Sequence, residues 1–175
     1  MMQPTHSSNR ILLPVRGWFI FLTLMVALFF DMIPLGRLPG VPDFVALTLA
    51  FWCVREPFKI GMAAAFLLGI AMDVASASVM GQHSLAYVLL AFAATGLSRR
   101  ILWFPLARQA LHILPLLLGT QLVMFAARMI AGAASPGWLY FLSSFTACLL
   151  WYPLTYLLLL PQYQSSMEKD ANRPI

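Results

Sequence analysis

The chain has 175 residues, of which 61% are hydrophobic and 10% are charged, and its mean hydropathy is +0.83. Soluble domains are about 45–50% apolar and about 25% charged, so this composition excludes an ordinary soluble protein and predicts an integral membrane protein. The formal net charge of +5 does not indicate nucleic-acid binding, because the basic residues lie between apolar segments rather than in one patch.

Six apolar segments are candidates for membrane-spanning helices, each of which needs about 20 mostly apolar residues. The first covers residues 17–33 and ends before Pro34. It is longer than the apolar region of a secretory signal and no small-residue cleavage motif follows it, so we expect a retained helix. The second, residues 41–54, is short and opens with Pro42, a residue favoured in the first turn of a helix.

The four remaining segments cover residues 58–79, 82–97, 109–131 and 138–160. Almost nothing separates the third from the fourth, which predicts a tight antiparallel hairpin. The expected fold is an all-α integral membrane protein, a six-helix transmembrane bundle over residues 17–160. A cytoplasmic N-terminal segment, residues 1–16, precedes it, and an irregular, polar cytoplasmic tail, residues 161–175, follows.

The distribution of Lys and Arg predicts the orientation. If all six segments cross, both termini and the loops after the second and fourth segments share one side of the membrane. Nine basic residues lie on that side and two on the other, which predicts cytoplasmic termini; five spans would spoil this asymmetry. The nine are Arg10, Arg16, Arg55, Lys59, Arg99, Arg100, Arg108, Lys169 and Arg173, and the two are Arg37 and Arg128.

Four tryptophans lie at or near segment ends, where aromatic side chains favour the membrane–water interface. We therefore expect interfacial positions for Trp18, Trp52, Trp103 and Trp138.

Small residues recur every four positions along the third segment, with one acid among them. Such a stripe drifts slowly around a helix and allows another helix to approach closely. Packing is the favoured interpretation, and a chance pattern is the alternative, since small residues are common in membrane helices. The stripe consists of Gly61, Ala65, Gly69, Asp73, Ala77 and Gly81.

Asp73 is the unusual member, because an acid inside a membrane needs a partner or a proton. One hypothesis is an ion or proton relay, or a ligand for a substrate. The favoured hypothesis is a structural anchor near the hairpin, with Gln82, His83 and Ser84 as candidate partners. A relay normally needs more than one intramembrane acid, and the other acids on that side, Asp31 and Asp43, lie near segment ends.

No combination of residues indicates an enzyme. We find no nucleophile beside a base, no His, Cys or Glu cluster with metal-ligand spacing and no phosphate-binding Gly-rich loop. The two cysteines, Cys53 and Cys148, lie within apolar segments and suggest neither a disulfide nor a metal site. The expectation is a protein without catalytic activity, metal or organic cofactor.

The stretches VPDFVALTLAFW, residues 41–52, and GIAMDVASASVMGQHSLAYVLLAF, residues 69–92, resemble the rod-shape-determining MreD family. Members pair a Pro-Asp or Pro-Asn helix entry and an aromatic helix end with a Gly-x-x-x-Asp, a further Gly and a small, apolar run. The matching residues here are Pro42, Asp43, Trp52, Gly69, Asp73, Gly81 and Ser84-Leu85-Ala86.

The resemblance implies a non-catalytic, multi-pass scaffold in the bacterial inner membrane that helps to organise peptidoglycan synthesis during cell elongation. The implied partners are MreC, the actin-like MreB and peptidoglycan synthases. Formation of a homodimer is a further alternative. The family's fold looks like the six-helix substrate-binding subunit of energy-coupling-factor vitamin transporters. That likeness sets up the alternative, a small-molecule-binding subunit of a transporter, for which Asp31, Arg37, Asp43, Asp73, His83 and Arg128 could line an outer pocket.

Overall fold

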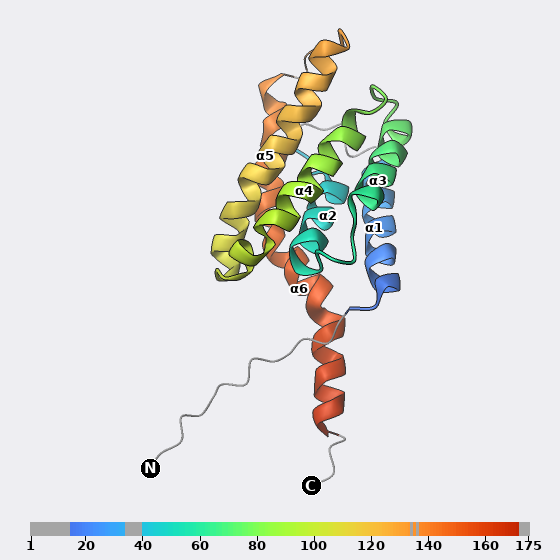
Figure 1. The fold of residues 1–175 in the computed structure, drawn as a ribbon. Coiled ribbons are helices and arrows are strands. Elements are labelled where there is room, and N and C mark those ends of the chain that lie inside the picture. The colour runs from blue at the N-terminus through green and yellow to red at the C-terminus, as the bar shows by residue number, and fades with distance from the viewer. Residues whose placement is uncertain (1–14, 34–39, 134, 136, 172–175) are drawn as a thin grey trace.

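The computed structural model describes residues 15–33, 40–133, 135 and 137–171, with side chains up to residue 160. This part of the chain is helical and contains no strand, which confirms the all-α class (Figure 1). The helices are α1 Gly17–Met32, α2 Phe44–Arg55, α3 Met62–Ala75, α4 Gln82–Leu102, α5 Leu106–Ile130, the 3₁₀ helix η2 Trp138–Phe141, and α6 Leu142–Ala171.

Three stretches are long and apolar enough to cross a membrane: α4, α5, and η2 with α6 as far as Leu160. The other three helices are apolar but shorter, with 16 residues in α1, 12 in α2 and 14 in α3. At 1.5 Å per residue α2 is only about 18 Å long, against a hydrocarbon core of about 30 Å. Length alone therefore leaves the six-span count a prediction.

Several helices differ from their predicted boundaries. The second begins at Phe44 with Asp43 as its N-cap, so Pro42 precedes the helix instead of lying in its first turn, and the fourth continues to Leu102, past the predicted end at residue 97. The third is shorter than the predicted 58–79, because Gly61 is its N-cap and the chain turns after Ala75, where Ala77 has a positive φ of 49°. Residues 161–171, expected to be an irregular tail, instead continue α6 as helix. This stretch contains Gln, Met, Glu, Lys and Ala, which are strong helix formers, so its polarity does not oppose a helix.

The short helix α2 lies at the centre of the bundle, in contact with α1, α4, α5 and α6. All ten residues from Val45 to Val54 are buried. The interfacial position expected for Trp52 is therefore wrong: its ring is fully buried and its Nε1 donates to Thr23 Oγ1 of α1 at 2.9 Å. The other three tryptophans of this prediction are 70–92% exposed, and their interfacial position stays a prediction: Trp18, Trp103 and Trp138.

The helices run up and down, so their connections gather at two ends of the bundle. The start of α1, the α2–α3 and α4–α5 connections and the end of α6 lie at one end, whereas the α3–α4 turn and the end of α5 lie at the other (Figure 1). Large apolar side chains cover the outer faces, among them Phe21, Phe29, Leu67 and Phe92, each more than 60% exposed. Such a surface suits lipid or partner helices.

Candidate functional site

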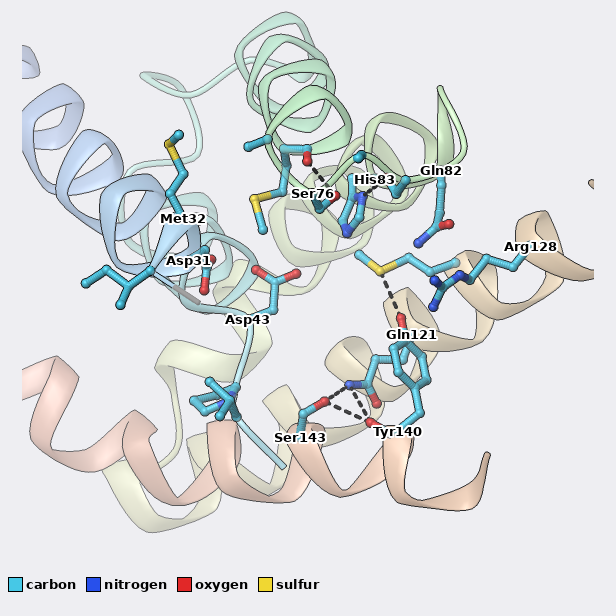
Figure 2. Close-up of a pocket in the computed structure, with 18 residues that line it drawn as sticks. Asp31, Met32, Asp43, Ser76, Gln82, His83, Gln121, Arg128, Tyr140 and Ser143 are labelled. Atoms are coloured by element: carbon cyan, nitrogen blue, oxygen red, sulfur yellow. Dashed lines mark hydrogen bonds between the residues drawn. The ribbon is translucent and has the colours of Figure 1, made fainter. Parts of the chain in front are cut away.

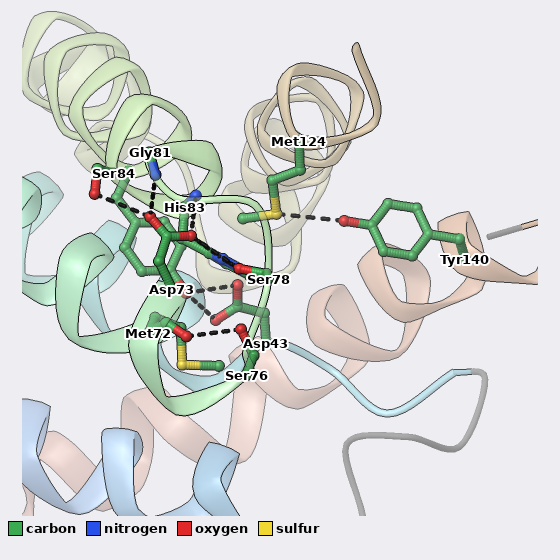
Figure 3. Close-up of polar contacts among 11 residues, drawn as sticks. Asp43, Met72, Asp73, Ser76, Ser78, Gly81, His83, Ser84, Met124 and Tyr140 are labelled. Carbon is green, nitrogen blue, oxygen red and sulfur yellow. Dashed lines mark hydrogen bonds and ion pairs between the residues drawn. The ribbon is translucent and has the colours of Figure 1, made fainter. Parts of the chain in front are cut away.

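Asp73 lies near the end of α3 and is only 2% exposed. Its Oδ1 accepts hydrogen bonds from Ser78 Oγ at 3.0 Å and the His83 backbone N–H at 2.9 Å, and contacts His83 Nδ1 at 2.7 Å. Its Oδ2 accepts from the Gly81 backbone N–H at 2.8 Å and from Ser84 Oγ at 3.2 Å (Figure 3). The carboxylate thus holds the α3–α4 turn and the first turn of α4 at the same time.

These contacts explain why a carboxylate is suitable at this position. The first N–H groups of a helix have no partner within it, and their dipoles favour a nearby negative charge. The N-cap of α4 is Gly81, which has a positive φ of 92° and no side chain to bond these groups. Asp73 therefore acts as a cap supplied by the preceding helix.

The predicted partners of Asp73 are only partly the observed ones. His83 and Ser84 bond to it, whereas Gln82, which is 3% exposed, turns away toward a cavity. Ser78, which was not predicted from the sequence, is an additional donor. Ser78 could have been predicted as a donor to Asp73 from its position in the short connection between two adjacent helices.

The stripe of small residues divides into two groups. Ala65, Gly69 and Asp73 are buried. A Cβ added to Gly69 would lie 2.3 Å from Ser84 Cα, so α3 and α4 touch backbone to backbone there. The remaining members are exposed, and a Cβ on Gly61 or Gly81 would crowd nothing else in the described structure: Gly61, Ala77 and Gly81.

A second group of acids lies at the N-terminus of α2. Asp43 is the N-cap and its Oδ1 accepts from the Ala46 N–H at 2.7 Å, while Asp31, from the end of α1, accepts from the Phe44 and Val45 N–H groups at 3.1 and 2.8 Å. Tyr87 of α4 donates to both Asp43 oxygens at 2.8 and 2.9 Å. Both acids, which lie near the ends of their predicted segments, thus help to hold α1, α2 and α4 together.

The role of Tyr87 was not predicted from the sequence. It is fully buried in α4, and a Tyr inside an apolar helix needs a partner for its hydroxyl. That requirement was a usable signal, but the partner, 44 residues away, was not predictable from spacing.

A cavity of about 360 Å³ opens above the start of α2 (Figure 2). It exists because α2 is short and begins inside the bundle, while the neighbouring helices continue past it. Pro42 is among the lining residues, and Asp73 is not. Arg37, predicted to lie on this side, falls outside the described residues. The polar lining side chains are Asp31, Asp43, Ser76, Ser78, Gln82, His83, Gln121, Arg128, Tyr140 and Ser143.

The wall of α5 and α6 holds its own polar contacts. Gln121 Nε2 donates to Ser143 Oγ, and Ser144 Oγ donates to Gln121 Oε1 at 2.6 Å. The Tyr140 hydroxyl donates to Met124 Sδ at 3.3 Å. These bonds fix α5 against the start of α6 at the side of the cavity.

The described residues contain no group of three or more His, Cys, Asp or Glu side chains that could hold a metal ion. Ser78 Oγ approaches His83 Nδ1 at 3.2 Å, but that nitrogen already contacts Asp73. This arrangement is a hydrogen-bond network that joins the α3–α4 turn to the start of α4.

Two matches relate the chain to known proteins. Residues 9–160 match the family model described as rod shape-determining protein MreD. The chain is 28% identical over 152 residues to "Rod shape-determining protein MreD" of Haemophilus influenzae, an alignment that covers 83% of this chain and 91% of that protein. No solved structure matches the chain significantly, so the expected likeness to the binding subunit of energy-coupling-factor transporters stays a prediction.

Proposed function

This chain belongs to the rod shape-determining MreD family, and we propose that it is a non-catalytic scaffold of the cell-elongation machinery in the bacterial inner membrane. Membership of the family supports a role in determining rod shape, and the family is not known for enzymatic activity. We also propose that the bundle holds MreC and, directly or through it, MreB and peptidoglycan synthases.

The observation that carries the scaffold proposal is how the acids are used. Asp31, Asp43 and Asp73 each accept backbone N–H groups at the start of a helix. Such contacts set the relative positions of α1, α2, α3 and α4. A bundle fixed in this way presents its apolar outer faces in a constant geometry, as a partner helix would require.

We further propose that all six helices belong to the membrane domain and that both termini are cytoplasmic. The helix ends and loops that carry Arg16, Arg55, Lys59, Arg99, Arg100 and Arg108 gather at one end of the bundle, and the end of α5 with Arg128 is at the other (Figure 1). The shortness of α2 is no obstacle, because this helix is buried in protein and does not contact lipid.

We expect reporter proteins fused after Arg100 and at the C-terminus both to report the cytoplasm. A reporter inserted after Met80, in the α3–α4 turn, should report the opposite side. The physical basis is the preference of Lys and Arg for the cytoplasmic side. A pair of reporters, alkaline phosphatase and a fluorescent protein, distinguishes the two sides of the membrane. A C-terminus outside the cytoplasm would contradict six spans.

The scaffold role is tested by complementation and co-purification. In a rod-shaped bacterium that lacks its own MreD, the full chain should restore rods, and tagged chain in mild detergent should retain MreC. Rounded cells despite normal membrane levels, or a chain that retains no MreC, would contradict the proposal. An unrelated six-helix protein with the same tag is the control for capture by detergent micelles.

The cavity favours the alternative function, a small-molecule-binding subunit of a transporter, because such subunits need an enclosed pocket with convergent polar groups. That function requires an energy-coupling ATPase as a partner. The same purification separates the two functions, since transporter ATPases in place of MreC would favour the alternative.

A further inference from the structure

The cavity above α2 has walls of opposite charge. Asp31 and Asp43 lie on one side, at the end of α1 and the start of α2, while Arg128 and Gln82 lie across the cavity, on α5 and α4 (Figure 2). These walls come from helices that meet only in the folded bundle. A ligand that touches both walls must carry a positive and a negative group.

Neither wall forms an ion pair within the described structure. The ion pairs there are Lys59–Glu56 and His83–Asp73, and neither includes Asp31, Asp43 or Arg128. The two acids accept hydrogen bonds from neutral donors, the α2 backbone and Tyr87, and the Asp31 carboxyl group also lies within hydrogen-bonding reach of Asp43. Two neighbouring half-buried carboxylates repel each other when both are ionised, so an ammonium group between them would favour the doubly ionised pair.

Two buried polar atoms at the opposite wall have no hydrogen-bond partner among the described residues: Gln82 Oε1 and Arg128 Nε. Gln82 is 3% exposed and faces the cavity. Buried polar atoms are nearly always paired, and an exception calls for a ligand or water that completes it. An anionic group beside Arg128 would accept from its guanidinium, and a donor on the ligand would reach Gln82.

We propose that this cavity binds a short zwitterion, whose ammonium group contacts Asp31 and Asp43 and whose phosphate or carboxylate contacts Arg128. A volume of about 360 Å³ is sufficient for a molecule of this size. Two sources carry this chemistry: the headgroup of phosphatidylethanolamine and a free amino-acid-like compound. The inference is independent of the scaffold role, because a chain that restores rods without binding a zwitterion would overturn only this inference.

The test uses full-length, detergent-purified and delipidated protein. Native mass spectrometry measures the binding of phosphatidylethanolamine and, as the headgroup control without an ammonium, phosphatidylglycerol. Thermal unfolding with phosphoethanolamine or glycine tests the free source. We expect saturable binding of one zwitterion per chain, with phosphatidylethanolamine favoured over phosphatidylglycerol.

Arg128→Gln should weaken this binding by about tenfold or more, because a charge-assisted hydrogen bond is lost. Asp31→Asn should also weaken it, because the ammonium group of the ligand loses a carboxylate partner. Arg108→Gln is the matched control, since Arg108 is exposed at the other end of the bundle. Each variant is checked for a monodisperse elution peak, so that a loss of binding reflects the cavity.

The outcomes separate the sources. Binding of phosphoethanolamine or glycine assigns the site to the zwitterionic group itself, and binding of phosphatidylethanolamine alone assigns it to the lipid. Absence of saturable binding, equal binding of phosphatidylglycerol, or equal effects of Arg128→Gln and Arg108→Gln would each overturn the inference.

Discussion

Gly69→Ala should destabilise the protein severely, although it adds a single methyl group. The new Cβ would lie 2.3 Å from Ser84 Cα and 2.5 Å from Ser84 N, both backbone atoms of α4. Ordinary carbon contacts are about 3.5–4.0 Å, so α3 and α4 must move apart. This movement would also strain the bonds between Asp73, one turn away, and the start of α4.

We expect the substitution to cost at least about 1–3 kcal/mol, which is typical of overpacked cores, in spite of the gain of about 1 kcal/mol that Ala normally brings to a helix. The measurement is the thermal unfolding midpoint in detergent, together with the monodisperse fraction in size-exclusion chromatography. Gly69→Leu, with a larger side chain, should prevent folding and therefore assembly with partners.

Gly96→Ala is the matched control for this prediction. Gly96 also lies in a helix, α4, but it is exposed, and a methyl group added there would meet no atom within 4 Å. The substitution should be neutral or stabilising by up to about 1 kcal/mol. Equal behaviour of the two alanine variants would show that the close contact between α3 and α4 does not contribute to stability.

Asp73→Leu should be nearly as damaging, for a different reason. It leaves the N–H groups of Gly81 and His83 and the hydroxyl of Ser84 without their acceptor. A buried donor that loses its acceptor costs about 1–3 kcal/mol. We expect a clear fall in the unfolding midpoint and loss of MreC from the purified chain, because the α3–α4 turn would no longer be fixed.

Asp73→Asn is more disruptive than its size suggests. From the sequence alone, a structural role for Asp73 predicts that Asn retains most function, since Asn keeps the size and an acceptor although it cannot ionise. In the structure both carboxylate oxygens accept from backbone N–H groups, so the Asn amide would place an N–H against either Gly81 or His83. We therefore expect intermediate stability and intermediate rod-shape complementation for Asn, between wild type and Leu.

Ser76→Ala is the control for the Asp73 variants. Ser76 is exposed at the same turn and bonds to Met72 O rather than to Asp73, so its removal should change little. A relay would give a different result: Asp73→Asn would abolish rod-shape complementation while the unfolding midpoint and MreC retention stayed at the wild-type level. That outcome would overturn the structural role of Asp73.

The composition and the short-range pattern were enough to predict the helical class and most helix positions. Apolar runs, Pro42 at the entry of α2 and the short connection between α3 and α4 depend on neighbouring residues, and such local interactions are readable along the chain. The same holds for Asp73, because its partners Ser78, Gly81, His83 and Ser84 all lie within eleven residues of it.

The sequence by itself therefore determined that this is a helical membrane protein with an acid-anchored hairpin and basic residues at one end. Only the tertiary structure decided that α2 is the central helix, which buries Trp52, and that Tyr87 bonds to Asp43 from 44 residues away. It also decided that Asp31, Asp43, Gln82 and Arg128 surround one cavity. The physical reason is that these contacts depend on which helices pack together, and in a uniformly apolar chain many packings satisfy the same hydrophobic pattern.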